Sequence, residues 1–119
     1  MFAKIVTFAL FSVALAAPSA PLEKRETGST SYFTPGLGAC GWTNGEGDMI
    51  AAIDSGVFDS QAPCGRMVRV TGAAGTADVQ IVDRCPGCGP NGLDLSPTAF
   101  QMIVGSLDIG RADTTWEWI

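Results

Sequence analysis

The chain has 119 residues, of which 12 are acidic, 7 are basic and none is histidine, so its net charge is −5. This length allows one domain with one hydrophobic core. The chain lacks the clustered cations that nucleic acids and anionic membrane surfaces attract, so we expect neither as a partner. A neutral polymer such as polysaccharide fits the charge better.

Residues 1–17 have the layout of a secretory signal peptide. A single lysine, Lys4, precedes an apolar run from Ile5 to Ala16, and the segment closes on small residues. The run is too short for the alternative, a membrane anchor, because a spanning helix needs about 20 apolar residues. The sequence therefore predicts a secreted, extracellular protein.

Residues 18–25 form a short proline-rich segment that ends in the dibasic pair Lys24–Arg25. In a secreted protein this pattern indicates a propeptide that a kexin-type protease removes, as in fungal secretory pathways, and a disordered tail is the alternative. Cleavage there leaves one mature domain, residues 26–119, which has four basic and eleven acidic residues and a net charge of −7.

All four cysteines lie in this mature domain, at Cys40, Cys64, Cys85 and Cys88. An even number in a small exported domain predicts two disulfides, for which three pairings are possible. The Cys85–Cys88 spacing also occurs in zinc and redox sites, but without histidine a four-ligand zinc site would need all four thiolates. We therefore expect structural disulfides, no metal and no cofactor.

Glycine and proline recur densely through the mature domain, which favours short strands and tight turns over long helices. Strand-like segments are predicted at 29–34, 67–71, 77–82 and 113–119. Two short helices are predicted, one at 49–53 capped by Asp48 and one that begins at Ser96–Pro97. The fold class is therefore mainly β, a small and mainly antiparallel barrel with two short helices.

Two carboxylates, Asp83 and Asp94, flank the tight loop Cys85–Cys88, and a strand-like segment runs directly into Asp83. Two acids on either side of a sugar–sugar bond can hydrolyse it, one as general acid and one as base or nucleophile. A structural role is the alternative, in which Asp83 pairs with Arg84 and Asp94 accepts backbone N–H bonds. Asp94, as an acid or a polar binding group, and Asp83 are the candidate catalytic residues.

Aromatic side chains are the second requirement of a carbohydrate site, because sugar rings stack on flat apolar surfaces. Trp42, in a glycine-rich segment, and Tyr32 are the candidates. Trp116 and Trp118 lie two apart on a predicted strand and share one face, which we expect to be core. Nucleophilic mechanisms that rely on a histidine base lack that residue here.

Several short motifs occur in the order found in the double-psi β-barrel. They are Tyr32–Phe33, Gly36–Gly41, Pro63–Gly65, Val82–Cys88 and Leu93–Phe100. Residues 28–119 resemble this domain as it occurs in expansins, barwin and rare lipoprotein A, and they are most similar to the small single-domain fungal loosenins. Taken together, these motifs are specific.

This resemblance implies a six-stranded double-psi β-barrel with a groove across one face. It also implies the pairings Cys40–Cys64 and Cys85–Cys88. The first bridge encloses more chain, so it should add on the order of 3 kcal/mol to the free energy of unfolding. Asp94 falls on the aspartate that expansins need for wall loosening and that family 45 endoglucanases use as catalytic acid. Asp83 falls on a second polar position that lines the same groove.

The sequence departs from these relatives at positions that matter for hydrolysis of a polysaccharide. Family 45 endoglucanases carry a catalytic base on the first strand, whereas this chain has no Asp or Glu between Glu26 and Glu46 and offers hydroxyls such as Ser31. The histidine of the expansin motif is replaced by Gly92, and we find no second, carbohydrate-binding domain like that of full expansins. Positioned proton transfer contributes about 10²–10⁴-fold, so an acid without a base is expected to be a poor hydrolase.

The sequence therefore predicts an expansin- or loosenin-like protein, acting as a monomer, that binds a glucan or chitin chain of the cell wall and loosens it without significant hydrolysis. The expected contacts are Asp94, Asp83, Ser31, Tyr32 and Trp42. An inhibitor of papain-like cysteine proteases, or a secreted effector that binds protein, is the alternative, since some small double-psi barrels inhibit such proteases. A third possibility is an oxidoreductase similar to riboflavin-aldehyde-forming enzymes, although the residues offer no flavin site.

Overall fold

The computed structural model describes residues 24–119. The predicted signal peptide, 1–17, and residues 18–23 of the predicted propeptide lie outside the described residues. Lys24 and Arg25 are exposed and directly precede the first strand. Within the described part of the chain, no helix is both long and apolar enough to span a bilayer.

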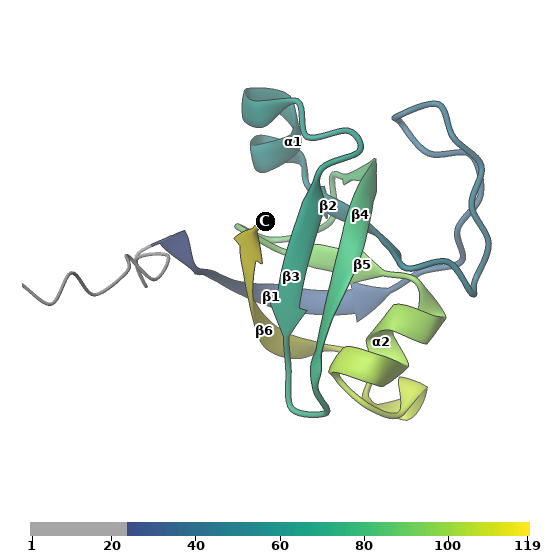
Figure 1. Cartoon of the computed structure of the whole chain (residues 1–119), viewed down its shortest axis with the longest axis vertical. Helices are drawn as coiled ribbons and strands as arrows, with labels where there is room; N and C mark the ends of the chain where they lie inside the picture. The colour runs from purple at the N-terminus through teal and green to yellow at the C-terminus, as the bar shows by residue number, and fades with distance from the viewer. Residues whose placement is uncertain (1–23) are drawn as a thin grey trace, which may run out of the picture.

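Six strands form a closed barrel in the order β1-β5-β2-β4-β3-β6 (Figure 1). The strands are β1 (Glu26–Tyr32), β2 (Ile50–Asp54), β3 (Met67–Thr71), β4 (Thr76–Cys85), β5 (Leu93–Leu95) and β6 (Ala112–Trp118). The β1–β5 and β2–β4 pairs are parallel, and the other four pairs are antiparallel. This architecture confirms the predicted mainly β fold and its six-stranded barrel.

Inward-facing side chains fill the barrel. Val68 and Val70 of β3 alternate with exposed residues, and Trp116 of β6 is 2% exposed, which agrees with the predicted strands and core face. The one polar pair at the centre, Thr30 and Thr114, is buried with its hydroxyl oxygens 2.7 Å apart, so the two hydroxyls satisfy each other.

Helix α2 (Pro97–Ile103) packs against β4, β1 and β5 and covers that side of the barrel. The Ser96 hydroxyl accepts a hydrogen bond from the Ala99 N–H at 3.2 Å, and Pro97 occupies the first turn, as predicted. Phe100 is fully buried and anchors the helix to the core. A 3-10 turn, Leu107–Ile109, then leads into β6.

The helix predicted at 49–53 is wrong, because this segment is strand β2. Its residues Ile50–Ile53 are buried almost completely between β4 and β5, so both faces are apolar and the alternation typical of a half-exposed strand is missing. The helix, α1 (Ser55–Gln61), begins six residues after the predicted start at 49, with Asp54 as its cap. The predicted cap, Asp48, instead accepts the Gly45 N–H at 2.8 Å within the preceding loop.

Both disulfides follow the pairing that the resemblance implies, Cys40–Cys64 and Cys85–Cys88. The first fastens the long loop of residues 33–49 to the connection between α1 and β3. The second closes the turn between β4 and β5. The two bridges differ in the chain that they enclose, with sequence separations of 24 and 3 residues.

We expect replacement of Cys40 and Cys64 together by serine to lower the free energy of unfolding by about 3 kcal/mol, because the bridge removes loop entropy from the unfolded chain. The corresponding double replacement of Cys85 and Cys88 should cost less, because its loop is very short. Guanidinium unfolding of the two variants measures the difference. An equal or reversed order would contradict this assignment of the disulfide contributions.

Candidate functional site

Asp94 faces outward because its two neighbours face inward. Leu93 and Leu95 of β5 are both 0% exposed and lie in the core. Since side chains alternate along a strand, Asp94 between them must point to the outer face. There its carboxylate is half-buried.

Four strands bring one row of residues together across this outer face. Ser31 of β1 is the register partner of Asp94 of β5, Asp94 is the partner of Ala52 of β2, and Ala52 is the partner of Asp83 of β4. We call Ser31, Asp94, Ala52 and Asp83 the cross-strand row. Two strand spacings separate the two acids, about 10 Å between their backbones. Ser31, Asp94 and Asp83 are partly exposed, whereas Ala52 between the two acids is 3% exposed, and residues 24–119 contain no enclosed pocket.

A β-bulge in β4 turns Asp83 toward this face. Ala51 pairs with Ile81 but Ala52 pairs with Asp83, so Val82 is the extra residue. Without the bulge, alternation from the inward Ile81 would place Val82 outward and Asp83 inward. Val82 is instead buried under the long loop, and its carbonyl accepts the Cys40 N–H at 3.2 Å.

Asp83 also holds the long loop in place. Its Oδ1 accepts two backbone hydrogen bonds of 2.8 Å, from the N–H groups of Ala39 and Arg84. The side-chain pair with Arg84 that the sequence offered as an alternative does not form, because the Arg84 guanidinium makes two 2.9 Å bonds to Asp59. Asp83 Oδ2 has no hydrogen-bond partner among the described residues, so it can accept one from a ligand.

The carboxylate of Asp94 is held in an unusual charge environment. Partial burial raises the pKa of Asp94 above its usual range, and the nearby Asp83 carboxylate adds to this effect. The Ser31 hydroxyl, which donates to Asp94 Oδ1 at 3.0 Å, and the Arg111 guanidinium both act in the opposite direction. Burial is the largest contribution, so the net shift is upward.

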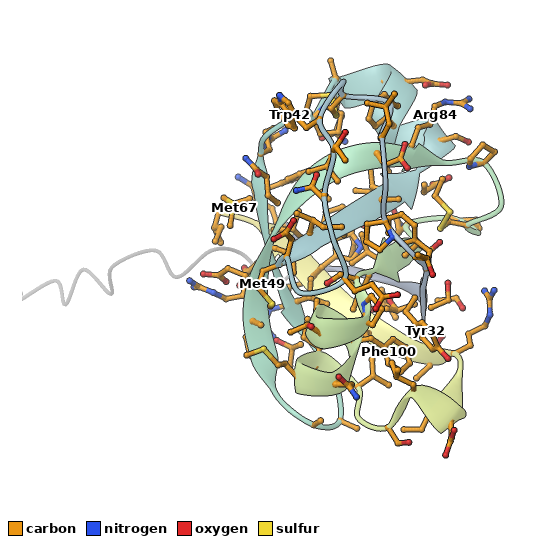
Figure 2. The ribbon with its side chains drawn as sticks, turned by 90° about the vertical axis from the view of Figure 1, so that its right-hand side faces the viewer. Tyr32, Trp42, Met49, Met67, Arg84 and Phe100 are labelled. Carbon is orange, nitrogen blue, oxygen red and sulfur yellow. A yellow bond between two sulfur atoms is a disulfide. The ribbon has the colours of Figure 1, made fainter. Side chains whose placement is uncertain are left out.

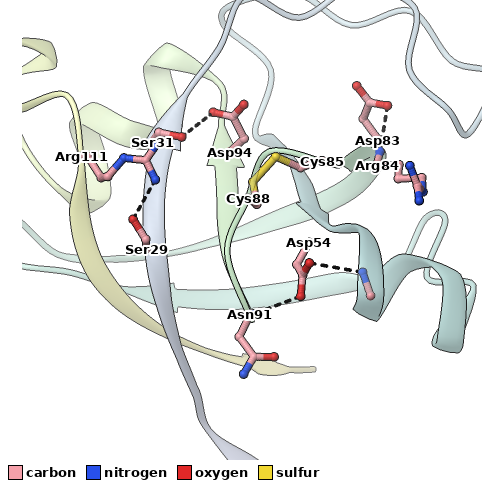
Figure 3. The surroundings of a disulfide bond; sticks show 11 residues. Ser29, Ser31, Asp54, Asp83, Arg84, Cys85, Cys88, Asn91, Asp94 and Arg111 are labelled. Carbon is pink, nitrogen blue, oxygen red and sulfur yellow. Dashed lines mark hydrogen bonds between the residues drawn. A yellow bond between two sulfur atoms is a disulfide. The ribbon is translucent and has the colours of Figure 1, made fainter.

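Arg111 is a site residue that the sequence analysis missed. It lies just before β6, and its Nη1 donates to Ser29 Oγ at 3.0 Å (Figure 3). Ser29 and Ser31 are two apart on β1 and share the outer face, so Arg111 extends the cross-strand row beyond Ser31. No sequence signal marks it, because Arg111 meets Ser29 only when β6 pairs with β1.

Asp54 and Asn91 fix the turn that precedes Asp94. Asp54 Oδ1 accepts the Gly56 N–H at 3.2 Å, and its Oδ2 accepts the Asn91 N–H at 3.1 Å (Figure 3). The Asn91 carbonyl in turn accepts the Trp116 indole N–H at 2.8 Å. These contacts tie the disulfide turn to both β2 and the core and so set the start of β5.

The two predicted aromatic contacts lie in different places. Trp42 is 45% exposed in the long loop, with its ring over Gly65, whose N–H bonds to the β4 carbonyl of Ile81. Tyr32 is half-buried, and its ring meets Phe100 edge-on at 4.9 Å. Figure 2 shows Tyr32 beside Phe100 and well away from Trp42. Because it alternates with Ser31, Tyr32 lies on the other face of β1 from the cross-strand row.

The arrangement supplies polar contacts but few groups for proton transfer. The outward positions of β1 opposite Asp94 are the hydroxyls of Ser29 and Ser31, and the nearest acid across the row is Asp83. Residues 24–119 contain no group of three or more His, Cys, Asp and Glu side chains suited to hold a metal ion. The row is thus a neutral-to-acidic hydrogen-bonding surface, flanked by Arg111 at one end and by the Trp42 loop at the other.

The raised pKa of Asp94 predicts a stability effect with a definite sign. The folded protein binds the proton more tightly than the unfolded chain, so this contribution to stability is fully present below the unfolded pKa and is lost as pH rises through the folded pKa. We therefore expect Asp94→Asn to raise the melting temperature at pH 7, and the gain to shrink as pH falls through the raised pKa of the folded protein and to vanish below the pKa of the unfolded chain. Melting curves over this range test it. Lower stability of the variant at pH 7 would contradict the assignment.

Known proteins agree with this fold. A family model described as lytic transglycolase, a double-psi β-barrel domain, matches residues 25–113. Expansin-like protein 2 of Dictyostelium discoideum is 39% identical over 99 residues, which cover 73% of this chain and 24% of the relative. The chain spans less than a third of the length of the first curated relatives that it matches.

Two solved structures are similar over most of the chain. A variant of the Clavibacter michiganensis expansin in complex with cellohexaose has a TM-score of 0.72 and 27% identity, and the match covers 80% of this chain and 50% of that one. The Streptomyces papain inhibitor has a TM-score of 0.70 and 30% identity, with coverage of 83% and 97%. The family model covers well over half of the sequence, and the barrel agrees with it, so the chain belongs to the rare lipoprotein A-like, expansin-like family of double-psi β-barrels.

Proposed function

We propose that this protein is secreted and binds cell-wall polysaccharide along the cross-strand row, loosening contacts between chains without significant hydrolysis. The observation that carries the proposal is the alignment of Ser31, Asp94 and Asp83 in one row across β1, β5, β2 and β4, with all three side chains partly exposed. An extended chain laid along this row would meet one polar group on three of the four strands that it crosses. The expansin solved with cellohexaose supports a β-linked glycan as the ligand class.

The two acids of the row can each accept a hydrogen bond from a sugar hydroxyl. Asp94 Oδ2 and Asp83 Oδ2 have no hydrogen-bond partner among the described residues, so each can accept a bond from a hydroxyl. Hydrogen bonds to charged groups contribute about 1.5–3 kcal/mol each, so two such contacts are enough to anchor a chain. Trp42, in the loop that Asp83 holds through Ala39, offers an exposed ring on which a further sugar would stack.

The proposal excludes efficient hydrolysis because Asp94 has no carboxylate partner on β1. Hydrolysis with a general acid also needs a group that activates water. The β1 positions that face Asp94 hold serine hydroxyls, and the other acid of the row, Asp83, lies two strands away from Asp94, where it holds the long loop through Ala39. The protein would therefore act by binding.

Sedimentation with insoluble cellulose, chitin and xylan tests the proposal directly. We expect the wild type to leave the supernatant with at least one polymer, and the reducing-sugar concentration to stay at the level of the blank. Absence of binding to all three polymers would contradict the proposed function. Release of reducing sugar that is lost in Asp94→Asn would contradict its non-hydrolytic part.

A second function, inhibition of a papain-like protease, is favoured by one specific observation. The loop of residues 33–49 is fastened by the Cys40–Cys64 bridge and exposes two large apolar side chains, Leu37 at 75% and Trp42 at 45%. A rigid loop with exposed apolar groups suits binding to a protein. The similarity to the Streptomyces papain inhibitor, which extends over almost that whole chain, supports it.

Papain assays with two variants separate this function from the first. If the protein is such an inhibitor, Leu37→Ser should weaken inhibition and Asp94→Asn should leave it unchanged. If it is a polysaccharide-binding protein alone, the wild type should not inhibit papain at all. Leu37 lies away from the core, so its replacement should not affect folding.

A further inference from the structure

In the part of the chain that the structure describes, Arg111 lacks the carboxylate partner that Arg69 and Arg84 have, and no aromatic ring covers it as one covers Arg66. Arg69 makes two hydrogen bonds to Asp78, and Arg84 makes two to Asp59. The guanidinium of Arg66 lies 3.9 Å from the centre of the Trp118 ring. Arg111 makes one hydrogen bond within residues 24–119, and its partner is the neutral hydroxyl of Ser29. Most of its five N–H donors therefore remain available on the exposed surface.

The hydrogen bonds on β1 also fix what each serine offers a ligand. Ser29 Oγ accepts from Arg111, so its own O–H is left to donate. Ser31 donates its only proton to Asp94, so its oxygen is left to accept. The two hydroxyls lie two residues apart along the strand, about 7 Å between their backbones. The surface thus has a donor end at Arg111 and Ser29 and an acceptor end at Ser31 and Asp94 (Figure 3).

The charges around Arg111 favour a neutral ligand over an anionic one. Asp94 is close enough to Arg111 for its ionisation to respond to the guanidinium, and the exposed Asp113 is the register partner of Ser29 on β6. A ligand carboxylate at Arg111 would therefore gain one cation but approach two anions. A neutral oxygen that is a strong acceptor avoids this repulsion and still uses the free N–H donors.

An amide carbonyl is such an oxygen, and an acetamido group carries an N–H donor beside it. Seated across β1, its carbonyl would accept from Arg111 and Ser29, and its N–H would donate to Ser31 or Asp94. A plain sugar hydroxyl is smaller and cannot reach both ends at once. We therefore propose that Arg111 is a specificity-determining contact that selects N-acetylated glycans, of the chitin type, over unsubstituted glucans.

This inference rests on the proposed binding of polysaccharide to the cross-strand row, and calorimetric titration tests it. The ligands are chitohexaose and cellohexaose, which have equal length and differ in the acetamido group. We expect the wild type to bind chitohexaose about tenfold more tightly, since a hydrogen bond to a charged group contributes roughly that factor or more. Arg111→Met keeps the aliphatic stem and should abolish this preference, with little change for cellohexaose. Arg111→Lys keeps one charged donor group and should retain part of the preference for chitohexaose.

Arg69→Met is the matched control, because Arg69 is an exposed arginine on β3 outside the row. It should keep the wild-type preference. The inference would be overturned if the wild type bound both sugars with equal affinity, or if Arg111→Met lost affinity for both sugars to the same extent. Either result would leave the proposed function standing. Binding of neither sugar would overturn both.

Discussion

Replacement of Asp94 by asparagine is expected to weaken polysaccharide binding about tenfold or more while the protein stays folded. The change removes the charge but keeps the shape of the side chain, and Ser31 can still donate to its oxygen. What is lost is the charged acceptor at the centre of the cross-strand row, whose hydrogen bond is expected to contribute about 1.5–3 kcal/mol. Binding isotherms on the polymer that the wild type prefers give the ratio of dissociation constants.

Asp78→Asn is the control for this comparison. Asp78 is a partly exposed acid on β4, but it pairs with Arg69 away from the row. Its replacement should leave the isotherm unchanged, although it alters the net charge by the same amount. Equal weakening by the two variants would mean that net charge alone drives binding. Unchanged binding by Asp94→Asn would remove Asp94 from the site.

Replacement of Gly28 by alanine is expected to lower the free energy of unfolding by about 3 kcal/mol or more. A Cβ atom on this buried glycine of β1 would overlap the carbonyl oxygen of Asn91. The carbonyl has little freedom to move, because it accepts the Trp116 indole N–H and the Asn91 N–H is held by Asp54. Guanidinium unfolding measures the effect.

The matched control is Gly36→Ala, where an added Cβ meets no atom within 4 Å. This variant should unfold at the same denaturant concentration as the wild type. The two substitutions add the same methyl group, so their difference isolates the close approach of β1 to the turn before β5. Similar midpoints for both variants would show that this contact is not tight in solution.

Much of the fold could be predicted because local pattern and environment agree. The alternation in Met67–Thr71 predicted β3, which has one face in the core and one in solvent. The Ser96–Pro97 pair predicted the start of α2, because cap and first-turn preferences are local. The disulfide pairing came from the resemblance, since the cysteine count left three possibilities open.

Other elements depend on tertiary contacts that no local pattern reveals. Strand β2 is buried on both faces, so Ile50–Ile53 carry no alternation that distinguishes a strand from a short buried helix. Strand β5 has three residues and owes its existence to pairing with β1 and β2. Such elements form only because the barrel around them is complete.

The candidate site was predicted in composition but not in geometry. Asp83, Asp94 and Ser31 do lie in one row, yet Asp83 faces it only because of the bulge at Val82. The adjacent apolar residues Ile81 and Val82, which interrupt the alternation of β4, are the one local sign of that bulge. Arg111 reaches the row through the pairing of β6 with β1, and no sequence pattern carries that information.

The central claim is that a polysaccharide chain lies along the cross-strand row, and amide chemical shifts of the ¹⁵N-labelled protein test it most directly. During titration with cellohexaose and chitohexaose, we expect the largest changes at Ser31, Ala52, Asp83 and Asp94, on four neighbouring strands. Changes confined to the loop of residues 33–49, or spread over the opposite side of the barrel around Arg69, would contradict the claim.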